Sequence, residues 1–294
     1  MRQGGLVRLD RGTEVVVGDD SPIRYQLASV SKQFTAAALL LLAQDGRIDL
    51  ADPLDRWIPG WPGVTLHHLL AHTSGIGHWA DYPMIDLAAR MEPAELVETF
   101  RSVPPLTAPG AAWRYSSPAY VLAAQVVERV ADTAYATFLA GRIFEPAGLT
   151  ATFAGPPGAR PDVAAGHDKH GEPLPSWNLD VVGMGAGDVW STTGDMTRWM
   201  SNLAAGDLLR EPWRTLMLTE RAATGQPDDH SRGYGYGWYV GTYAGEPWFH
   251  HSGHNAGYIT FAASLPESDR RLVLLTNNEA MGMPDIFALL RSLL

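Results

Sequence analysis

The sequence predicts a mixed α/β (α+β) fold in which an antiparallel sheet lobe with flanking helices and a mainly helical lobe share one cleft. Alternating apolar residues lie near the N-terminus, a long helix-rich region follows, and strand patterns return after about residue 233. Sheets and helices in this order bury their apolar faces in layers. We expect one domain over residues 1–294, with the sheet lobe at about 1–60 and 210–294 and the helical lobe at about 61–209.

The composition limits the possible partners and the possible chemistry. Lys and Arg number 22 against 32 Asp and Glu, so the formal net charge is −10, and a surface of that sign repels phosphate groups. The longest apolar run, 36–43, has 8 residues, whereas a membrane span needs about 20. We therefore expect no nucleic-acid partner and no membrane partner. With 0 Cys, covalent catalysis would have to use oxygen or nitrogen.

The N-terminal elements are predicted to be a hairpin and a buried helix. Residues 6–17 alternate around Gly12-Thr13, which indicates a short β-hairpin. From Ser29 to Gln44 nearly all residues are good helix formers, and Asp45-Gly46 supplies a stop. Because this helix is apolar almost all round, we expect it at the centre of the protein.

The middle of the chain is predicted to be helical and the C-terminal part to be a strand meander. Helical patterns lie near 66–71, 93–101, 118–131, 134–143 and 194–205, and Pro and Gly clusters at 104–110 and 155–161 separate them as loops. The expected strands are Tyr234–Tyr243, Trp248–His251, Gly257–Leu265 and Arg271–Thr276, with turns at Gly245-Glu246 and Pro266–Asp269. A last helix is expected at about 284–294.

The start of the central helix carries the first candidate for chemistry. Of the 22 basic residues only 2 are lysines, Lys32 and Lys169, and lysine can lose its proton when desolvated whereas arginine cannot. Ser29 and Lys32 are three residues apart, so their side chains share one face of the helix. Lysine titrates near ~10.4, and burial can lower its pKa by the ~3 units that a base at neutral pH needs. By itself the pair is also compatible with a helix cap followed by a surface lysine.

Four further motifs accompany the Ser29 and Lys32 pair along the chain. They are Tyr115-Ser116-Ser117 before a helix, His250 to Gly257 between strands, Leu69 to Ile76 after a turn, and Gly187 to Asp195. In this order they resemble the serine β-lactamase and penicillin-binding protein-like family, particularly the branch with class C β-lactamases, D-alanyl-D-alanine carboxypeptidases and carboxylesterases. The resemblance runs from about residue 6 to the end, and it implies a β-lactamase/transpeptidase-like fold.

The resemblance also implies roles for individual residues. Ser29 would be the nucleophile that forms an acyl-enzyme, and Lys32 and Tyr115 would share the movement of its proton. The catalytic and substrate-binding strand would carry His251-Ser252-Gly253, and the backbone N–H groups of Ser29 and His254 would form the oxyanion hole. This fits the chemistry, because an alcohol needs a base and a tetrahedral intermediate needs fixed donors.

Two positions depart from the family's pattern. Ser117 stands where the family usually has the Asn of Tyr-x-Asn, and a serine is too short to reach a substrate amide in the same way. This substitution argues against recognition of an acylamino side chain. His251 stands where most β-lactamases and transpeptidases have Lys. We expect its charge to titrate near ~6.5 and not to be permanent.

Histidine and aromatic clusters have alternative interpretations. One histidine group consists of His250, His251 and His254, and another of His67, His68, His72 and His78. Such clusters raise the possibility of a metal site, but no His-Glu-x-x-His occurs and no carboxylate completes a ligand set, so we expect no metal and no cofactor. His72 is expected to support a turn. Five aromatic residues are candidates for either the acyl pocket or the core: Trp79, Tyr82, Trp177, Tyr236 and Trp238.

The function that these observations favour is that of a serine hydrolase acting on small carboxylic esters or amides, with weak β-lactam activity left open. The partner would be a small acyl substrate, and the oligomeric state is left open. The N-terminus lacks the apolar stretch of a secretion signal, so we expect a cytoplasmic protein. Two alternatives remain at this point: an acyltransferase or peptide cyclase that uses the same acyl-enzyme, and a non-catalytic binding protein that keeps the fold.

Overall fold

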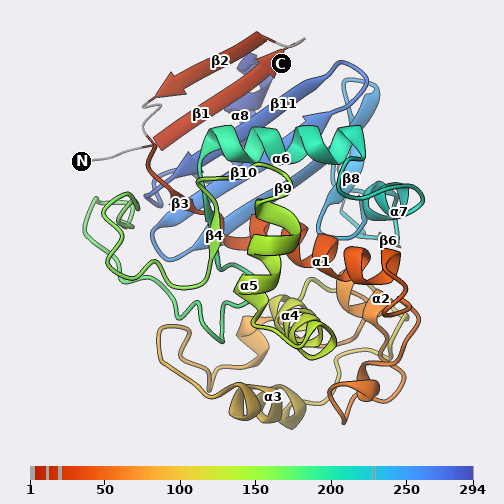
Figure 1. Ribbon diagram of the computed structural model, residues 1–294. Helices are drawn as coiled ribbons and strands as arrows, with labels where there is room; N and C mark the ends of the chain where they lie inside the picture. Colours follow the sequence, from red (N-terminus) through yellow and green to blue (C-terminus); the bar gives the residue numbers. More distant parts are fainter. Residues whose placement is uncertain (1–3, 11–12, 19–21, 227, 229, 294) are drawn as a thin grey trace.

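The computed structural model describes residues 4–10, 13–18, 22–226, 228 and 230–293. Its main feature is an eight-stranded antiparallel sheet with strand order β2-β1-β11-β10-β9-β8-β7-β6 (Figure 1). The strands are β1 Gly4–Asp10, β2 Thr13–Gly18, β6 Ala222–Ala223, β7 Gly233–Tyr234, β8 Tyr239–Tyr243, β9 Glu246–Asn255, β10 Tyr258–Leu265 and β11 Arg270–Thr276. A second sheet contains β3 Tyr25–Gln26, β5 Val189–Ser191 and β4 Phe153–Ala154, in that order.

Helices surround this sheet and fill the other half of the molecule. They are α1 Lys32–Gln44, α2 Leu66–Leu70, α3 Pro93–Ser102, α4 Ser117–Ala131, α5 Tyr135–Leu139, α6 Thr193–Ala205, α7 Trp213–Leu218 and α8 Met283–Leu293. Short turns of helix occur at η1 Ala28–Ser31, η2 Leu54–Arg56, η3 Trp79–Asp81 and η4 Ala140–Phe144. The predicted mixture of antiparallel sheet and helices is therefore confirmed.

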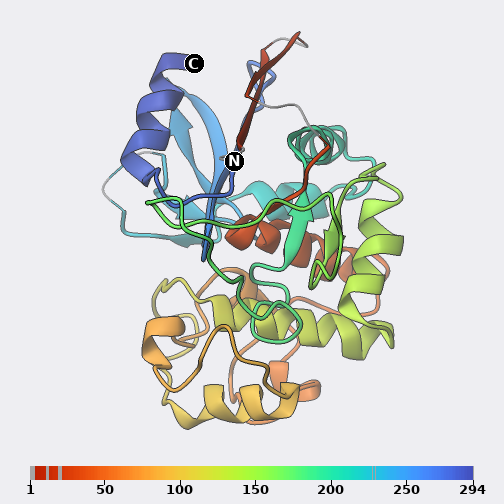
Figure 2. The same cartoon turned by 90° about the vertical axis from the view of Figure 1, so that its left-hand side faces the viewer.

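The two ends of the chain meet in the main sheet. Strand β1 pairs with β11, and Leu6 lies opposite Leu274. Strand β2 pairs with β1 as the predicted hairpin, although Gly12 of its turn lies outside the described residues. Figure 2 shows α6 and α8 on opposite faces of the sheet. Helix α6 packs against β1 and β11. The division of the chain into two lobes remains a prediction.

Alternation along the strands explains why both faces are covered. Leu272 and Leu274 of β11 belong to one buried cluster with Ile286 of α8, while Val273 and Leu275 belong to the larger cluster on the other side. Successive side chains of a strand point to opposite faces, so a strand that is apolar throughout needs a helix on each side. The sheet is accordingly an internal layer of the molecule.

Helix α1 lies at the centre, as its all-apolar sequence predicts. Every residue from Lys32 to Ala43 is buried. Phe34 packs between Phe144 and Trp199, with ring centroids 5.4 Å and 4.7 Å away. Trp199 of α6 also donates a hydrogen bond to Gln33 Oε1 at 3.1 Å. The helix that carries the lysine is thus fixed from several sides.

Several predicted elements differ from the structure at their ends, among them the strand expected at Trp248–His251, which is β9 Glu246–Asn255. The helix expected from Ser29 begins as the 3-10 turn η1, and the α-helix starts at Lys32. Ala28, directly before Ser29, has φ 47°, a left-handed conformation that costs energy for a residue with a side chain. The hairpin turn expected at Gly245-Glu246 lies one residue earlier, because Tyr243 pairs with Glu246.

The strand expected over Tyr234–Tyr243 is interrupted. It divides into β7 and β8, and Gly237 between them has φ 77°. A Cβ atom at Gly237 would lie 2.8 Å from the backbone oxygen of Lys32. The chain leaves the strand conformation here because it passes directly over the start of α1, and only glycine permits so close an approach.

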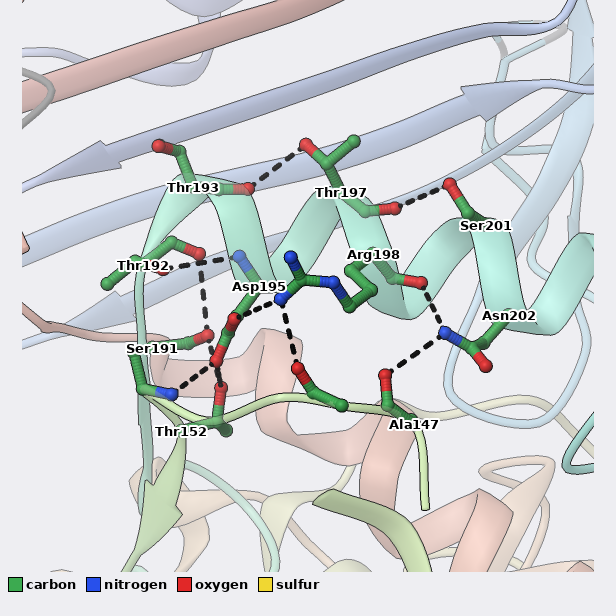
Figure 3. A network of polar contacts seen from close by, with 12 residues as sticks. Ala147, Thr152, Ser191, Thr192, Thr193, Asp195, Thr197, Arg198, Ser201 and Asn202 are labelled. Carbon is green, nitrogen blue, oxygen red and sulfur yellow. Dashed lines mark hydrogen bonds and ion pairs between the residues drawn. The ribbon is translucent and has the colours of Figure 1, made fainter. Parts of the chain in front are cut away.

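A polar network attaches the segment from β5 to α6 to the neighbouring loop (Figure 3). The Thr192 side chain caps α6 by accepting a hydrogen bond from the Asp195 N–H at 3.2 Å. Asp195 is buried and accepts hydrogen bonds from the Ala151 N–H and the Thr152 hydroxyl, both at 2.8 Å. Arg198 forms an ion pair with the same carboxylate at 3.0 Å. The motif from Gly187 to Asp195 therefore includes a structural anchor.

Candidate active site

Ser29 and Lys32 are in direct contact. Lys32 Nζ lies 2.9 Å from Ser29 Oγ, and Ser29 opens into the cleft between the helices and the sheet. Val189 of β5 holds the turn, since Leu27 N–H donates to its carbonyl at 2.8 Å and its own N–H donates to Ser31 Oγ at 3.0 Å. The backbone on both sides of the nucleophile candidate is therefore fixed.

The surroundings of Lys32 favour the neutral amine. Its side chain is fully buried, and burial lowers its pKa well below the usual 10.5, while the nearby Asp188 carboxylate acts in the opposite direction. Lys32 Nζ also lies 2.8 Å from the carbonyl oxygen of Ala186. Because a carbonyl only accepts, one N–H of the amine points to Ala186, and the lone pair of the neutral amine can face the Ser29 hydroxyl.

Asp188 is a residue of this site that the sequence analysis did not single out. It is buried, and its Oδ1 accepts a hydrogen bond from the Gly185 N–H at 3.0 Å. Burial raises the pKa of Asp188 to about 7, and the charge of Lys32 opposes that shift. The Asp188 anion raises the pKa of Lys32, and the Lys32 cation lowers the pKa of Asp188, so each charge favours the other.

Tyr115 completes the group around Ser29. Its ring centroid lies 5.0 Å from Lys32 Nζ, and the nearby hydroxyls of Ser29 and Ser117 act to lower the pKa of its phenol. Burial raises the pKa of Tyr115 well above 10, so the phenol keeps its proton until a base is close. Ser29, Lys32 and Tyr115 are thus connected by direct contacts.

The segment before α4 holds Tyr115 in place through two histidines. Ser116 N–H donates to His72 Nδ1 at 3.1 Å, and Ser117 N–H donates to His78 Nδ1 at 3.2 Å. His72 is fully buried with its ring 4.4 Å from the ring of Tyr115, and its φ is 58°. The expected turn at His72 is present, and the histidine also supports the tyrosine loop. Among the described residues no group of three or more metal-ligating side chains occurs.

Strand β9 forms the opposite wall and carries His251. His251 Nδ1 lies 2.6 Å from the Ser252 carbonyl oxygen, and its Nε2 lies 3.0 Å from the Tyr234 hydroxyl. Burial, with a smaller contribution from Lys32, lowers the pKa of His251 to about 3. The expectation that this ring titrates near ~6.5 is therefore wrong, because the side chain is buried beside another basic group and not exposed to water.

Gly253 and Asn255 explain how close β9 comes to the nucleophile turn. A Cβ atom at Gly253 would collide with the Leu27 carbonyl oxygen and with Thr260 Oγ1, so the strand can lie against the turn only without a side chain there. Asn255 Nδ2 donates to Gln26 Oε1 at 2.8 Å and to the Gly187 carbonyl at 3.0 Å. Asn255 thus connects β9 to the segments that contain Gln26 and Gly187. The sequence analysis did not predict this role.

The cleft above Ser29 has a volume of about 300 Å³. Its lining includes most of the predicted site, namely Ser29, Tyr115, Ser117, His251, Ser252 and His254. Of the five aromatic candidates, Trp79 and Trp177 line it, whereas Tyr82, Tyr236 and Trp238 are buried in the core. His78 and Tyr239 also line it. Local sequence could not separate these cases, because the side on which an aromatic ring lies depends on packing between distant segments.

A second hollow of about 270 Å³ lies beside Tyr115 and His78. Those two residues line both spaces. Trp113, Arg114 and Asp81 contribute to the second hollow as well. A group held there would lie next to the tyrosine that contacts Ser29.

Comparison with known proteins decides the family. A model of the family described as Beta-lactamase matches residues 9–292. This chain belongs to the beta-lactamase family. The resemblance inferred from the motifs is therefore confirmed, and so is the fold that it implied.

The relatives of this beta-lactamase family member include proteins named as penicillin-binding proteins and as an esterase. A penicillin-binding protein of Bacillus subtilis (strain 168) is 30% identical over 280 residues, which cover 87% of this chain and 61% of that protein. Esterase EstB of Burkholderia gladioli is 35% identical over 145 residues, 42% of this chain and 37% of the esterase. The chain thus spans less than two thirds of either relative.

Solved structures agree in fold. A penicillin-binding protein from Bacillus halodurans has a TM-score of 0.87 with 23% identity, and the match covers 99% of this chain and 96% of that one. A D-stereospecific amidohydrolase from Streptomyces sp. has a TM-score of 0.84 with 26% identity, and the match covers 97% and 92%. In the part of the beta-lactamase-family chain that the structure describes, no helix has the length and apolarity needed to cross a membrane.

Proposed function

We propose that this chain is a serine hydrolase that cleaves small carboxylic esters or amides through an acyl-enzyme on Ser29. The observation that carries the proposal is the 2.9 Å contact between Ser29 Oγ and the buried Lys32 Nζ at the floor of the cleft. A serine becomes a nucleophile near neutral pH when an adjacent group can take its proton. The names of the relatives, which include an esterase and an amidohydrolase, are consistent with this reaction class.

In the first half-reaction the neutral Lys32 amine takes the Ser29 proton while Ser29 Oγ attacks the carbonyl carbon. The carbonyl oxygen becomes an oxyanion, which the backbone N–H groups of Ser29 and His254 would bind. Tyr115 passes a proton to the leaving oxygen or nitrogen, and Lys32 returns one to Tyr115, so the leaving group departs neutral as the C–O or C–N bond breaks. A single oxyanion donor contributes about 3 kcal/mol to such a step.

In the second half-reaction water replaces the leaving group. The same base takes a proton from water, the resulting hydroxide attacks the acyl carbon, and the proton returns to Ser29 Oγ when the ester bond breaks. The products are a carboxylic acid and free enzyme. Ser252, which lines the cleft from β9, would contact the bound substrate during both half-reactions. The cytoplasmic location expected from the sequence stays a prediction that cell fractionation can test.

A labelling experiment tests the proposal. The protein is incubated with a fluorophosphonate probe and with a panel of 4-nitrophenyl esters, D-amino acid amides and nitrocefin, and the adduct is located by intact and peptide mass spectrometry. We expect one adduct on Ser29 and turnover of at least one panel member. Ser29→Ala should abolish both, whereas Ser201→Ala on α6 should keep both. A native, ligand-binding protein with no adduct on Ser29 would support the non-catalytic alternative.

Acyl transfer is a second candidate function, which the hollow that shares Tyr115 and His78 with the cleft favours. An acceptor alcohol or amine held beside Trp113 would lie next to the tyrosine that handles the leaving group. The assay supplies one ester with increasing concentrations of an amine. A transfer product that saturates with amine would support transferase activity, while hydrolysis alone would support the esterase or amidase.

A further inference from the structure

The cleft above Ser29 has no fixed charge on its walls. Among the described residues, its lining consists of histidine, aromatic, hydroxyl, amide, aliphatic and glycine residues, with no Lys, Arg, Asp or Glu. Lys32 and Asp188 lie beneath the floor and are both buried. The charge that a substrate meets in the cleft therefore depends on three histidines: His78, His251 and His254.

Burial favours the neutral form of the His251 ring, and its two hydrogen bonds are compatible with that form. The Ser252 carbonyl can only accept, so His251 Nδ1 carries the proton and donates to it at 2.6 Å. His251 Nε2 lies 3.0 Å from the Tyr234 hydroxyl, which can donate to this nitrogen when the ring is neutral. Both nitrogens have partners within the protein, and burial, more than the neighbouring Lys32, disfavours a charge on the ring. His251 offers the cleft an uncharged wall.

The other two histidines, His78 and His254, also offer the cleft no unpaired positive charge. His78 Nδ1 accepts a hydrogen bond from the Ser117 N–H, and burial lowers the pKa of His78 to about 4. His254 is exposed at the edge of the cleft, but its Nε2 lies 3.1 Å from the Glu279 carboxylate. Glu279 is held there by the Gly257 N–H at 3.0 Å. A cation formed on His254 would thus be paired with an anion of the same protein.

We infer that this cleft selects acyl donors that carry no carboxylate near the bond to be cleaved, that is, uncharged or cationic esters and amides; the inference rests on the proposed function. A carboxylate entering the cleft would lose water without gaining a cationic partner. The net charge of −10 adds long-range repulsion of anions. A cationic group, by contrast, could contact the rings of Trp79, Trp177 and Tyr239.

Three aryl acetates of nearly equal size test the inference. They are 3-acetoxybenzoate, 3-acetoxybenzamide and 3-acetoxyphenyltrimethylammonium, and each kcat/KM is divided by the rate of that ester's reaction with hydroxide. We expect the anion to be slower than the amide by about tenfold or more, and the cation to be no slower than the amide. An anion that reacts as fast as the amide, or a cation that reacts more slowly, would overturn the inference.

A pair of variants separates charge from shape. Ser252 is half-buried on the cleft wall, so Ser252→Lys adds a cation there and Ser252→Met adds a chain of similar length without charge. Relative to Ser252→Met, Ser252→Lys should improve the anion-to-amide ratio about fivefold or more. Equal ratios in the two folded variants would show that charge does not set the selectivity.

The proposed function is checked separately with the fluorophosphonate adduct on Ser29. Labelling with no discrimination among the three esters would leave the hydrolase standing and overturn only the inference. No labelling and no turnover of any of the three would overturn both.

Discussion

Lys32 contacts Ser29 because the two residues stand three apart across the end of a 3-10 turn, where Lys32 N–H donates to the Ser29 carbonyl. In a 3-10 turn the side chains at positions i and i+3 are eclipsed, so the contact follows from local geometry. The burial that makes Lys32 a base does not. It depends on segments far away along the chain, such as the one that places the Ala186 carbonyl oxygen 2.8 Å from Lys32 Nζ.

Replacing Lys32 by arginine should remove most of the activity although it keeps a basic residue. A guanidinium does not lose its proton in a protein, so it cannot accept one from Ser29. We expect kcat to fall below about a tenth of the wild-type value, a loss of more than ~1.4 kcal/mol. Steady-state turnover of a 4-nitrophenyl ester measures kcat, and stopped-flow kinetics measure the acylation step separately. The exposed Lys169→Arg is the matched control, and a Lys32→Arg variant with more than a tenth of kcat would contradict the role of Lys32.

Removing the Tyr115 hydroxyl should slow acylation with little effect on substrate binding. General acid–base groups contribute about 10²–10⁴-fold, and Tyr115→Phe removes one while keeping the ring that packs 4.4 Å from His72. Single-turnover kinetics separate the acylation rate from the dissociation constant. Tyr243→Phe, at the start of the turn after β8, is the control. An unchanged acylation rate in Tyr115→Phe would assign proton transfer to Lys32 alone.

The pH–rate profile should respond to Asp188. The Asp188 anion raises the pKa of Lys32, and Lys32 acts as a base only above its own pKa. Asp188→Asn keeps an oxygen for the Gly185 N–H but removes the anion, so the pKa of Lys32 should fall and the acid limb of kcat/KM should move to lower pH. Profiles from pH 4 to pH 9 would test this. A shift to higher pH would contradict the coupling, and the exposed Asp207→Asn should leave the limb in place.

Asp195→Ala should lower stability without changing the chemistry. The variant leaves the Ala151 N–H and the Thr152 hydroxyl without the carboxylate that now accepts from them. An unpaired buried donor costs about 1–3 kcal/mol. Urea unfolding should show a lower midpoint with unchanged slope, while labelling of Ser29 by fluorophosphonate proceeds at the wild-type rate in native conditions. A variant as stable as the exposed Asp207→Ala would contradict the role of the network.

The sequence by itself determined the local features of this protein. The central helix follows from its run of helix-forming residues, and the N-terminal hairpin and the C-terminal strands follow from the alternation of apolar residues; both signals depend on neighbouring residues only. The spacing of Ser29 and Lys32 fixed which side chains could touch. The order of the motifs led to the family that the comparison confirmed.

Only the tertiary structure decided the electrostatics of the cleft. His251 belongs to a recognisable motif, but its neutral state depends on the Tyr234 hydroxyl and on burial beside Lys32. His72 and His78 support the Tyr115 loop from a distant segment, and Asp188 became part of the site only when β5 packed against η1. A pKa depends on which groups surround an atom in space and on how much water they exclude, and neither quantity is a property of the neighbouring residues in the chain.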